Sequence, residues 1–341
     1  MPEVRSRVPA LDYPALLSAA WAEHLAPRAD GAPTFVSTFA GVGGSSLGYS
    51  MAGFRELLAV EWDARAAATF RLNFPSVPVY EGDIARLTVK EILRLTGLRP
   101  GDLDLLDGSP PCQGFSTAGE REIEDPRNQL FRDYCRLLKG LRPKGFVMEN
   151  VSGMVKGKMR LIFADILREL KACGYDVKAW LLNSMYFQVP QNRQRMVFIG
   201  TRLEWPPTCP KATSRPVTVR QAIGHLPLGV RGNHQPQVIN AWHRSKPGQS
   251  LRKAVKHVGS FQSVRLDPDA PSTTQIKSVV NWHYALPRKL TREEAALLGS
   301  FPVEFQWAGA KAHAHQGIGN SVPPLFMRAI ASHVRREVLR A

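Results

Sequence analysis

Apolar residues between positions 34 and 200 come in short runs, which alternate with segments whose apolar residues recur at helical spacing. The short runs predict strands at 34–39, 57–60, 77–80, 103–107, 145–148, 177–183 and 195–200. The helical spacing predicts helices at 47–52, 64–73, 89–96, 130–141 and 162–173. Because such alternation is typical of parallel sheets, we expect an α/β fold with a doubly wound, mostly parallel sheet. The last two strands leave little room for a helix between them, which predicts an antiparallel hairpin at one edge.

Both flanks of this region carry a different pattern. Asp12 has the character of an N-cap for a short helix, and after residue 201 prolines interrupt an irregular stretch. Helical patterns return after Thr291, which with Glu294 has the spacing of a capping box, and run again from Pro324 to about Leu339. We therefore expect an N-terminal helical lead (1–33), an α/β domain (34–201), a small irregular region (202–275) and a C-terminal segment (276–341).

Composition narrows the class of protein. With 44% apolar and 22% charged residues, 341 residues suffice for one large domain and a small one. No apolar run approaches the roughly 20 residues that cross a bilayer, and no signal peptide is present, so we expect a cytoplasmic protein with no membrane partner. The four cysteines, Cys112, Cys135, Cys173 and Cys209, lack metal-ligand spacing, which predicts no metal site.

The positive charge is uneven along the chain. Residues 201–290 contain 14 Lys and Arg against 3 Asp and Glu, or +11 of the total of +16. A solvated basic face would explain the charge alone. The aromatic and imidazole rings among these charges, such as Trp242 and His257, favour a surface that binds a polyanion instead.

A glycine-rich turn follows the first predicted strand. Residues 40–48 read AGVGGSSLG, a sequence that lets a ligand approach the backbone closely, although it does not complete the dinucleotide pattern. Glu61 ends the second strand and Asp83 follows the third, so both are expected at the carboxyl edge of the sheet, where ligands bind. These acids favour a nucleoside ligand with neutral or positive charge, while NAD and a purely structural turn stay open from these residues alone.

Three further groups of residues bear chemistry. Cys112 follows two prolines after the fourth strand, an arrangement that favours a rigid, exposed nucleophile over a buried packing cysteine. Glu149 ends the next strand, where a carboxyl can act as an acid or as a hydrogen-bond partner. Arg193 and Arg195 lie two residues apart, so in an extended backbone both face one side and can stabilise negative charge on a heterocycle. Taken singly, Glu149 and both arginines could equally be solvated surface groups.

In this order, the motifs closely resemble those of the cytosine-5 DNA methyltransferases of bacterial restriction–modification systems. The residues that carry the resemblance are Phe39-Ala40-Gly41 with Gly43-Gly44, Glu61, Asp83, Pro110-Pro111-Cys112-Gln113, Glu149-Asn150-Val151, Gln191-x-Arg193-x-Arg195 and Gly319-Asn320-Ser321-Val322. The match spans roughly residues 34 to 330, and the Cys, Glu and Gln-x-Arg-x-Arg motifs together are highly specific.

The resemblance implies a Rossmann-like fold that binds S-adenosyl-L-methionine and releases S-adenosyl-L-homocysteine. In this family pattern Glu61 binds the ribose hydroxyls, Trp62 packs on the adenine and Asp83 binds its amino group. The remaining implied cofactor contacts are Phe39, Ala40, Gly41, Gly43, Gly44, Ile84, Pro111, Leu130, Phe301, Asn320 and Ser321. Residues 117–129 correspond to a loop that closes over DNA, 202–275 to the target-recognition region, and 276–341 to a return to the catalytic domain.

The implied reaction methylates C5 of a cytosine that has been flipped out of double-stranded DNA. Cys112 would add to C6 of the base, Glu149 would hold N3 and the exocyclic amine, and Arg195 with Arg193 would contact the O2 side. Gln113, Ser116 and Thr273 are the implied DNA contacts. The family further implies a monomer that acts at the nucleoid on a short target, with a cognate restriction endonuclease as an open question.

Two other functions would fit parts of this pattern. A tRNA cytosine-5 methyltransferase would share the fold, but the Cys-Phe-Thr signature of that group is missing from the sequence. A non-catalytic DNA-binding regulator would be favoured by the loss of Cys112, Glu149 or Arg195, all of which are present. A DNA methyltransferase is therefore the favoured interpretation.

Overall fold

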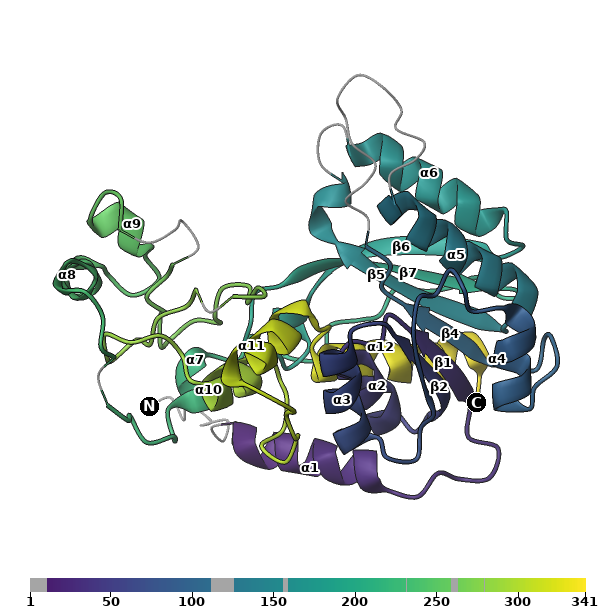
Figure 1. The fold of residues 1–341 in the computed structure, drawn as a ribbon, viewed down its shortest axis with the longest axis horizontal. Coiled ribbons are helices and arrows are strands. Elements are labelled where there is room, and N and C mark those ends of the chain that lie inside the picture. Colours follow the sequence, from purple (N-terminus) through teal and green to yellow (C-terminus); the bar gives the residue numbers. More distant parts are fainter. Residues whose placement is uncertain (1–10, 112–125, 156–158, 231, 259–262, 279) are drawn as a thin grey trace, which may run out of the picture.

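The computed structural model describes residues 11–111, 126–155, 159–230, 232–258, 263–278 and 280–341. Within these ranges seven strands form one sheet, in the order β3-β2-β1-β4-β5-β7-β6 (Figure 1). The strands are β1 (Thr34–Thr38), β2 (Arg55–Glu61), β3 (Val79–Glu81), β4 (Leu105–Gly108), β5 (Gly145–Val151), β6 (Asp176–Asn183) and β7 (Gln194–Thr201). Strand β7 runs antiparallel to both β5 and β6, and the other neighbours pair in parallel. The predicted mostly parallel sheet and the hairpin at its edge are confirmed.

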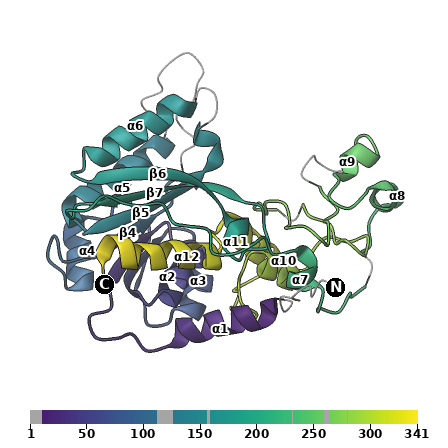
Figure 2. The same ribbon diagram turned by 180° about the vertical axis from the view of Figure 1, so that it is seen from behind.

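Helices cover both faces of the sheet (Figures 1 and 2). On one face lie α1 (Tyr13–Leu25), α2 (Gly44–Met51), α3 (Ala64–Asn73) and α12 (Pro324–His333), and on the other lie α4 (Val89–Thr96), α5 (Pro126–Leu141) and α6 (Met159–Lys171). Alternate strand residues supply the two cores, as Phe35 and Val36 illustrate, because successive side chains of a strand point to opposite faces. Both cores are thus built by the same strands.

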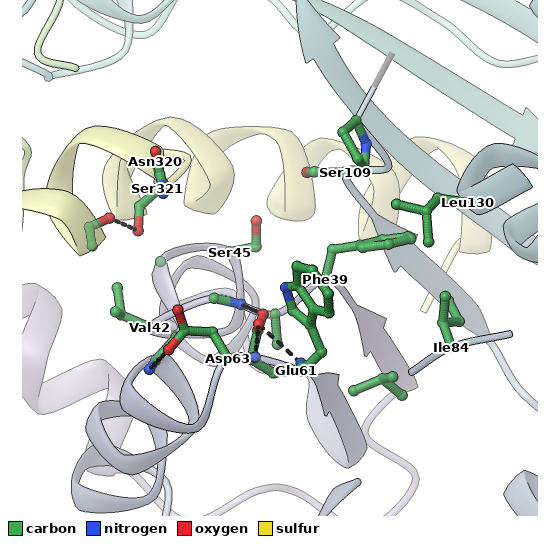
Figure 3. Close-up of a pocket in the computed structure, with 18 of the residues that line it drawn as sticks. Phe39, Val42, Ser45, Glu61, Asp63, Ile84, Ser109, Leu130, Asn320 and Ser321 are labelled. Carbon is green, nitrogen blue, oxygen red and sulfur yellow. Dashed lines mark hydrogen bonds between the residues drawn. The ribbon is translucent and has the colours of Figure 1, made fainter. Parts of the chain in front are cut away.

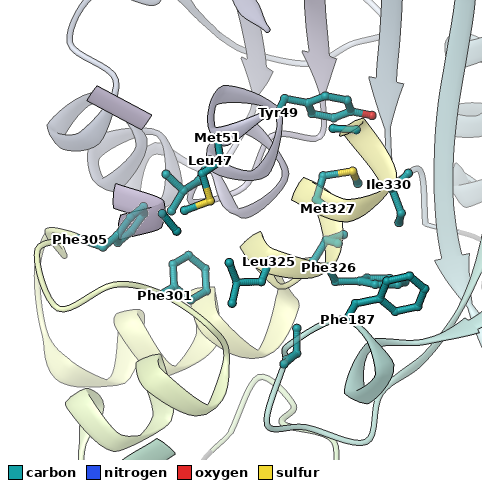
Figure 4. Close-up of a cluster of buried hydrophobic side chains, with 14 of the residues drawn as sticks. Leu47, Tyr49, Met51, Phe187, Phe301, Phe305, Leu325, Phe326, Met327 and Ile330 are labelled. Atoms are coloured by element: carbon teal, nitrogen blue, oxygen red, sulfur yellow. The ribbon is translucent and has the colours of Figure 1, made fainter. Parts of the chain in front are cut away.

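The helix α12 completes the first core, although it lies far along the sequence from α2. A Cβ atom on Gly48 of α2 would lie 2.6 Å from Cβ of Met327, so the glycine permits the two helices to approach closely. Leu47, Met327 and Ile330 meet in this cluster together with Phe187 and Phe326, which pack edge to face (Figure 4). The C-terminal segment therefore belongs structurally to the sheet domain.

A smaller, irregular part of the molecule lies beyond the sheet, at the left of Figure 1. It contains the short helices α7 (Val219–Ile223), α8 (Pro236–Arg244) and α9 (Leu251–Ala254), and α10 (Arg292–Leu298) and α11 (Lys311–Asn320) connect it back to the sheet. A separate cluster of its buried apolar residues, among those described, consists of Ala241, Trp242, Leu251, Val258 and Trp282, whereas Val219, Ala222 and Ile223 of α7 are buried in the core of the sheet domain. We refer to the five residues of the separate cluster as the small core.

The segment that leaves β7 first runs along the sheet domain. The guanidinium of Arg202 donates to the carbonyls of Arg142 and Pro143, and the indole N–H of Trp205 donates to the carbonyl of Val338 at 2.7 Å. Val338 belongs to η3 (Val334–Leu339), a π-helix that continues α12. The two remaining short elements in the described ranges are the 3-10 turns η1 (Ser152–Val155) and η2 (Ser184–Tyr186).

The local signals at helix ends are confirmed. Asp12 caps α1 by accepting from the amide of Ala15, and Thr291 and Glu294 form a complete capping box at α10. The helix α11 was not predicted, because Lys311–Asn320 has few apolar residues and two glycines. In the part of the chain that the structure describes, no helix is long and apolar enough to span a bilayer.

Candidate active site

A cavity of about 1100 Å³ opens at the carboxyl ends of β1, β2 and β4. Glu61 lies at its centre, Phe39, Ile84 and Leu130 lie toward one end, and Asn320 and Ser321 lie toward the other (Figure 3). The carboxyl edge of a parallel sheet is where such folds bind ligands, so the cavity occupies the expected place.

Twelve of the fourteen sequence-predicted cofactor residues line this cavity. They are Phe39, Ala40, Gly41, Gly44, Glu61, Trp62, Asp83, Ile84, Pro111, Leu130, Asn320 and Ser321. The structure thus brings together residues from six segments of the sequence, while their contacts with a cofactor stay a prediction.

The carboxylate of Glu61 is held by the backbone around it. One oxygen accepts from the amide of Gly41 at 2.7 Å, and the other accepts from the amides of Trp62 and Asp63 at 3.0 and 2.8 Å. Burial raises the pKa of Glu61 above its ordinary value, and the three amide donors counteract part of that rise. The acid is therefore fixed in orientation at the cavity wall.

The glycine turn has two different roles. Gly41 has φ +58° and lines the cavity, and a Cβ atom there would meet no other atom within 4 Å. Gly43 has φ +97° and does not line the cavity, because it faces the protein, where a Cβ atom would lie 2.5 Å from the ring of Phe74. Gly43 accordingly shapes the turn from behind.

Phe301 is placed elsewhere than the resemblance implied. It is completely buried and packs against Phe305 and Trp307, with ring centroids 4.9 and 5.1 Å away. The aromatic ring is used to build the core behind α10, so no surface of it remains for a ligand in the cavity.

Several cavity residues were not singled out from the sequence. Arg65 and Thr69 come from α3, Asp133 from α5, and His313 and Gln316 from α11. The signal was available in part, because positions 313, 316, 317 and 320 follow the spacing of one helical face once α11 is known. Asp133 likewise lies one helical turn after Leu130.

A second group of residues meets where β5 ends and β7 begins. The guanidinium Nε of Arg195 lies 2.6 Å from Oε1 of Glu149, and only 8% of Glu149 is exposed. The side-chain amide of the neighbouring Asn150 donates to the carbonyl of Pro110 at 3.0 Å. This bond ties the end of β5 to the proline turn that precedes Cys112, so the acid and the predicted nucleophile segment are held together.

Arg193 behaves differently from Arg195. It is 3% exposed, and its two terminal nitrogens donate to the carbonyls of Gln275 and Gly319 at 2.9 and 3.0 Å. The sequence predicts that both arginines face one ligand, but these contacts place Arg193 differently. Arg193 precedes β7, and both of its terminal nitrogens donate to carbonyls of the protein itself.

The predicted DNA contacts are described only in part. Gln113 and Ser116 lie outside the described residues, as does Cys112, the predicted nucleophile. Thr273 is exposed, and its hydroxyl donates to the side chain of Asn281 at 2.8 Å. The loop expected at 117–129 overlaps α5, which begins at Pro126, so its last residues are helical.

Comparison with known proteins decides the family. The family model for C-5 cytosine-specific DNA methylase matches residues 33–336. This chain belongs to that family. The type II methyltransferase M1.HphI of Haemophilus parahaemolyticus is 37% identical to this methylase over 326 residues, with 88% of this chain and 86% of the relative covered. The type II methyltransferase M.XorII of Xanthomonas oryzae pv. oryzae is 30% identical and covers 89% of this chain and 85% of its own.

Solved structures agree with the fold of this methylase. A prophage-encoded protein of E. coli superimposes with a TM-score of 0.75 at 26% identity, covering 91% of this chain and all of its own. A DNMT2 variant of Spodoptera frugiperda has a TM-score of 0.65 at 18% identity, covering 89% and 99%. The chain is thus a DNA cytosine-5 methyltransferase with a Rossmann-like methyltransferase fold. Across the described ranges, no cluster of three His, Cys, Asp or Glu side chains could hold a metal ion.

Proposed function

We propose that this methylase transfers a methyl group from S-adenosyl-L-methionine to C5 of a flipped-out cytosine in a short duplex DNA target, through a covalent bond between Cys112 and C6. The observation that carries the proposal is the buried pair of Glu149 and Arg195, which Asn150 ties to the proline turn before Cys112. In this arrangement the carboxyl group of Glu149 and the guanidinium of Arg195 could bind one small heterocycle next to the proposed nucleophile.

The cavity fits the proposed methyl donor. Four carboxylates line it, those of Glu61, Asp63, Asp83 and Asp133, which suits a ligand that carries a sulfonium charge. Phe39 and the 78% exposed Trp62 offer aromatic surface for an adenine ring, and the fixed carboxylate of Glu61 can accept from ribose hydroxyls. Gly41 leaves open space where a side chain would intrude.

The protein groups have distinct tasks in the reaction. The thiolate of Cys112 forms a bond to C6, and the electron pair displaced from the C5–C6 double bond moves into the ring as N3 takes a proton from the carboxyl of Glu149. Glu149 hydrogen-bonds N3 and the exocyclic amine in this step, and Arg195 stabilises the charge at O2. When bound, the donor supplies the electrophilic methyl group that C5 takes up, and its sulfonium becomes neutral S-adenosyl-L-homocysteine. Transfer of the C5 proton to solvent water then re-forms the C5–C6 double bond and expels the Cys112 thiolate from C6, and N3 returns its proton to Glu149.

Residues 202–275 form the proposed target-recognition region, between a catalytic domain at 34–201 and a return segment at 276–341. Support comes from the charge of +11 over residues 201–290, because basic side chains displace the counterions of DNA phosphates. Arg and Lys side chains that reach guanine edges would each contribute about 1–3 kcal/mol of discrimination. We further propose that the enzyme acts as a monomer in the cytoplasm, at the nucleoid, and that any cognate restriction endonuclease acts separately.

Bisulfite sequencing of DNA from cells that express the protein tests the activity and maps the target. We expect protected cytosines at one position of a short recurring sequence. Expression of Cys112→Ala serves as the control and should protect none. An absence of protection by the wild-type protein, with S-adenosyl-L-homocysteine binding intact, would contradict the DNA substrate and favour the tRNA alternative.

The covalent step has its own test. In the presence of S-adenosyl-L-methionine, a duplex with 5-fluorocytosine at the mapped position should form a complex that survives denaturing electrophoresis, because the methylated C5 then carries fluorine and has no proton to lose. Cys112→Ala should abolish this complex while S-adenosyl-L-homocysteine still binds, and Cys209→Ala, at an exposed cysteine, should trap as the wild type does. Trapping by Cys112→Ala would show that the nucleophile is another residue.

A further inference from the structure

Arg193 joins three segments that lie far apart in the sequence. Its own segment leads into β7 and Arg195, its Nη1 donates to the carbonyl of Gln275, and its Nη2 donates to the carbonyl of Gly319. Each of these segments belongs to a different part of the enzyme, so a single guanidinium holds their relative placement.

The first two segments are bound along their length. The amide of Asn192 donates to the carbonyl of Ser272 at 2.8 Å, and the hydroxyl of Thr274 donates back to the carbonyl of Asn192 at 2.7 Å. The amide of Gln275 donates to the side chain of Gln191 at 3.1 Å. These hydrogen bonds therefore attach residues 272–275, where the proposed recognition region ends, to the backbone that carries Arg195.

The third segment forms a wall of the cavity. Gly319 precedes Asn320 and Ser321, which both line it. A Cβ atom on Gly319 would overlap the carbonyl of Ile276, so the glycine is required for the close contact between the return of the recognition region and the cavity wall. Arg193 spans this contact from the other side.

The charge of Arg193 is costly where it lies. Burial, and next the nearby charge of Arg195, lower the pKa of Arg193 to about 9, with Glu149 acting in the opposite direction. Its Nε–H is buried without an acceptor among the described residues. A side chain needed only to fill this space would not require a charge, whereas two divergent carbonyl acceptors require the planar fork of an arginine.

We propose that Arg193 is a positioning residue that couples the seating of DNA in the recognition region to the donor cavity, and that it does not contact the flipped base. The inference rests on the proposed function. A shift of residues 272–275 on DNA binding reaches the cavity wall through Arg193 and Gly319, and it reaches Glu149 through the backbone of Arg195.

Coupling is measured as a ratio of two affinities. The dissociation constant of S-adenosyl-L-homocysteine is determined by calorimetry without DNA and with a saturating duplex that carries the mapped target. Arg193→Lys keeps the charge but cannot reach both carbonyls, so we expect the ratio to fall by at least about fivefold from the wild-type value. Thermal unfolding of each variant, followed by circular dichroism, confirms that it is folded.

A duplex with an abasic site in place of the target cytosine separates positioning from base contact. The loss of duplex affinity in Arg193→Lys should be the same on the intact and the abasic duplex. Arg195→Gln, the matched control for a base contact, should lose affinity on the intact duplex only. If the defect of Arg193→Lys also vanishes on the abasic duplex, Arg193 touches the base and the proposal is wrong.

Gly319→Ala provides a second variant that leaves Arg193 in place. Its added methyl group should displace Ile276 and reduce the affinity ratio as Arg193→Lys does. A ratio that stays at the wild-type value in both variants, whatever happens to the separate affinities, would assign Arg193 a merely structural role. These affinity ratios are interpreted only if the wild-type protein methylates its target. A failure of the proposed function is therefore distinguished from a failure of the coupling.

Discussion

The two parts of this methylase are stabilised on very different scales. The sheet domain has a core on each face, drawn from all seven described strands and from helices at both ends of the sequence. The recognition part has the small core of five described residues, supplemented by the stacking of Arg265 over Trp242 at 3.9 Å. Because little apolar area is buried there, each residue of the small core contributes a larger share of local stability. Damage to the small core should therefore remove target reading while the sheet domain stays folded.

Loss of the acid is expected to have the largest effect on the chemical half. Glu149→Gln keeps the shape of the side chain but removes its proton transfer and its pairing with Arg195, so single-turnover methyl transfer should fall by about 10²–10⁴-fold. Binding of S-adenosyl-L-homocysteine and of duplex should change little. Glu293→Gln, at an exposed ion pair on α10, is the control and should retain wild-type rates. A rate in Glu149→Gln within threefold of wild type would remove Glu149 from the mechanism.

Substitutions of two tryptophans that have similar partners test how the recognition part is stabilised. Trp242 donates its indole N–H to the carbonyl of His283 at 3.0 Å beneath Arg265, and Trp205 donates to Val338 beneath Arg340. Trp242→Ala should destabilise the small core by about 3–5 kcal/mol and abolish specific DNA binding, while donor affinity is retained. Trp205→Ala should leave DNA binding intact. Equal loss of both affinities in Trp242→Ala would mean that the two parts fold as one unit.

A smaller effect, on the pH dependence of stability, should distinguish the sheet domain from the recognition part. Burial is the main reason that the pKa of Glu56 rises from 4.5 to about 8, and the hydroxyls of Ser37 and Ser46, which donate to it, oppose that rise. The unfolded chain loses this proton near pH 4.5 and the folded chain only near 8, so the stability of the sheet domain should fall as the pH rises between these values. In Glu56→Gln the decrease in Tm over this range should be shallower. An unchanged slope would show that Glu56 does not titrate in this way.

Much of the sheet domain could be predicted because its signals are local. Apolar runs placed every strand of the described sheet to within a few residues, and Thr291 with Glu294 marked the start of α10. The helices α7, α8, α9 and α11 were missed, because short or polar helices have little apolar periodicity and depend on tertiary contacts.

Within the site, side chains were easier to predict than their partners. Glu149 and Arg195 were both singled out, and the structure shows that they form an ion pair. Arg193 binds main-chain carbonyls at positions 275 and 319, which no sequence pattern can indicate because every residue offers a carbonyl. For Phe301 the residue type fits a cofactor contact and a core position equally well, and only the packing of Phe305 and Trp307 decides between them.

The contact between α2 and α12 also governs the order in which the enzyme can assemble during synthesis. The glycine turn and α2 emerge from the ribosome early, whereas the helix that covers them is among the later segments described. Contacts between such distant segments form slowly, because a long intervening chain must be closed first. A nascent chain therefore holds one part of the cavity wall, Phe39 to Ser45, before Asn320 and Ser321 complete it. The proposed binding of the donor, and with it DNA methylation, can begin only after most of the described chain has been translated.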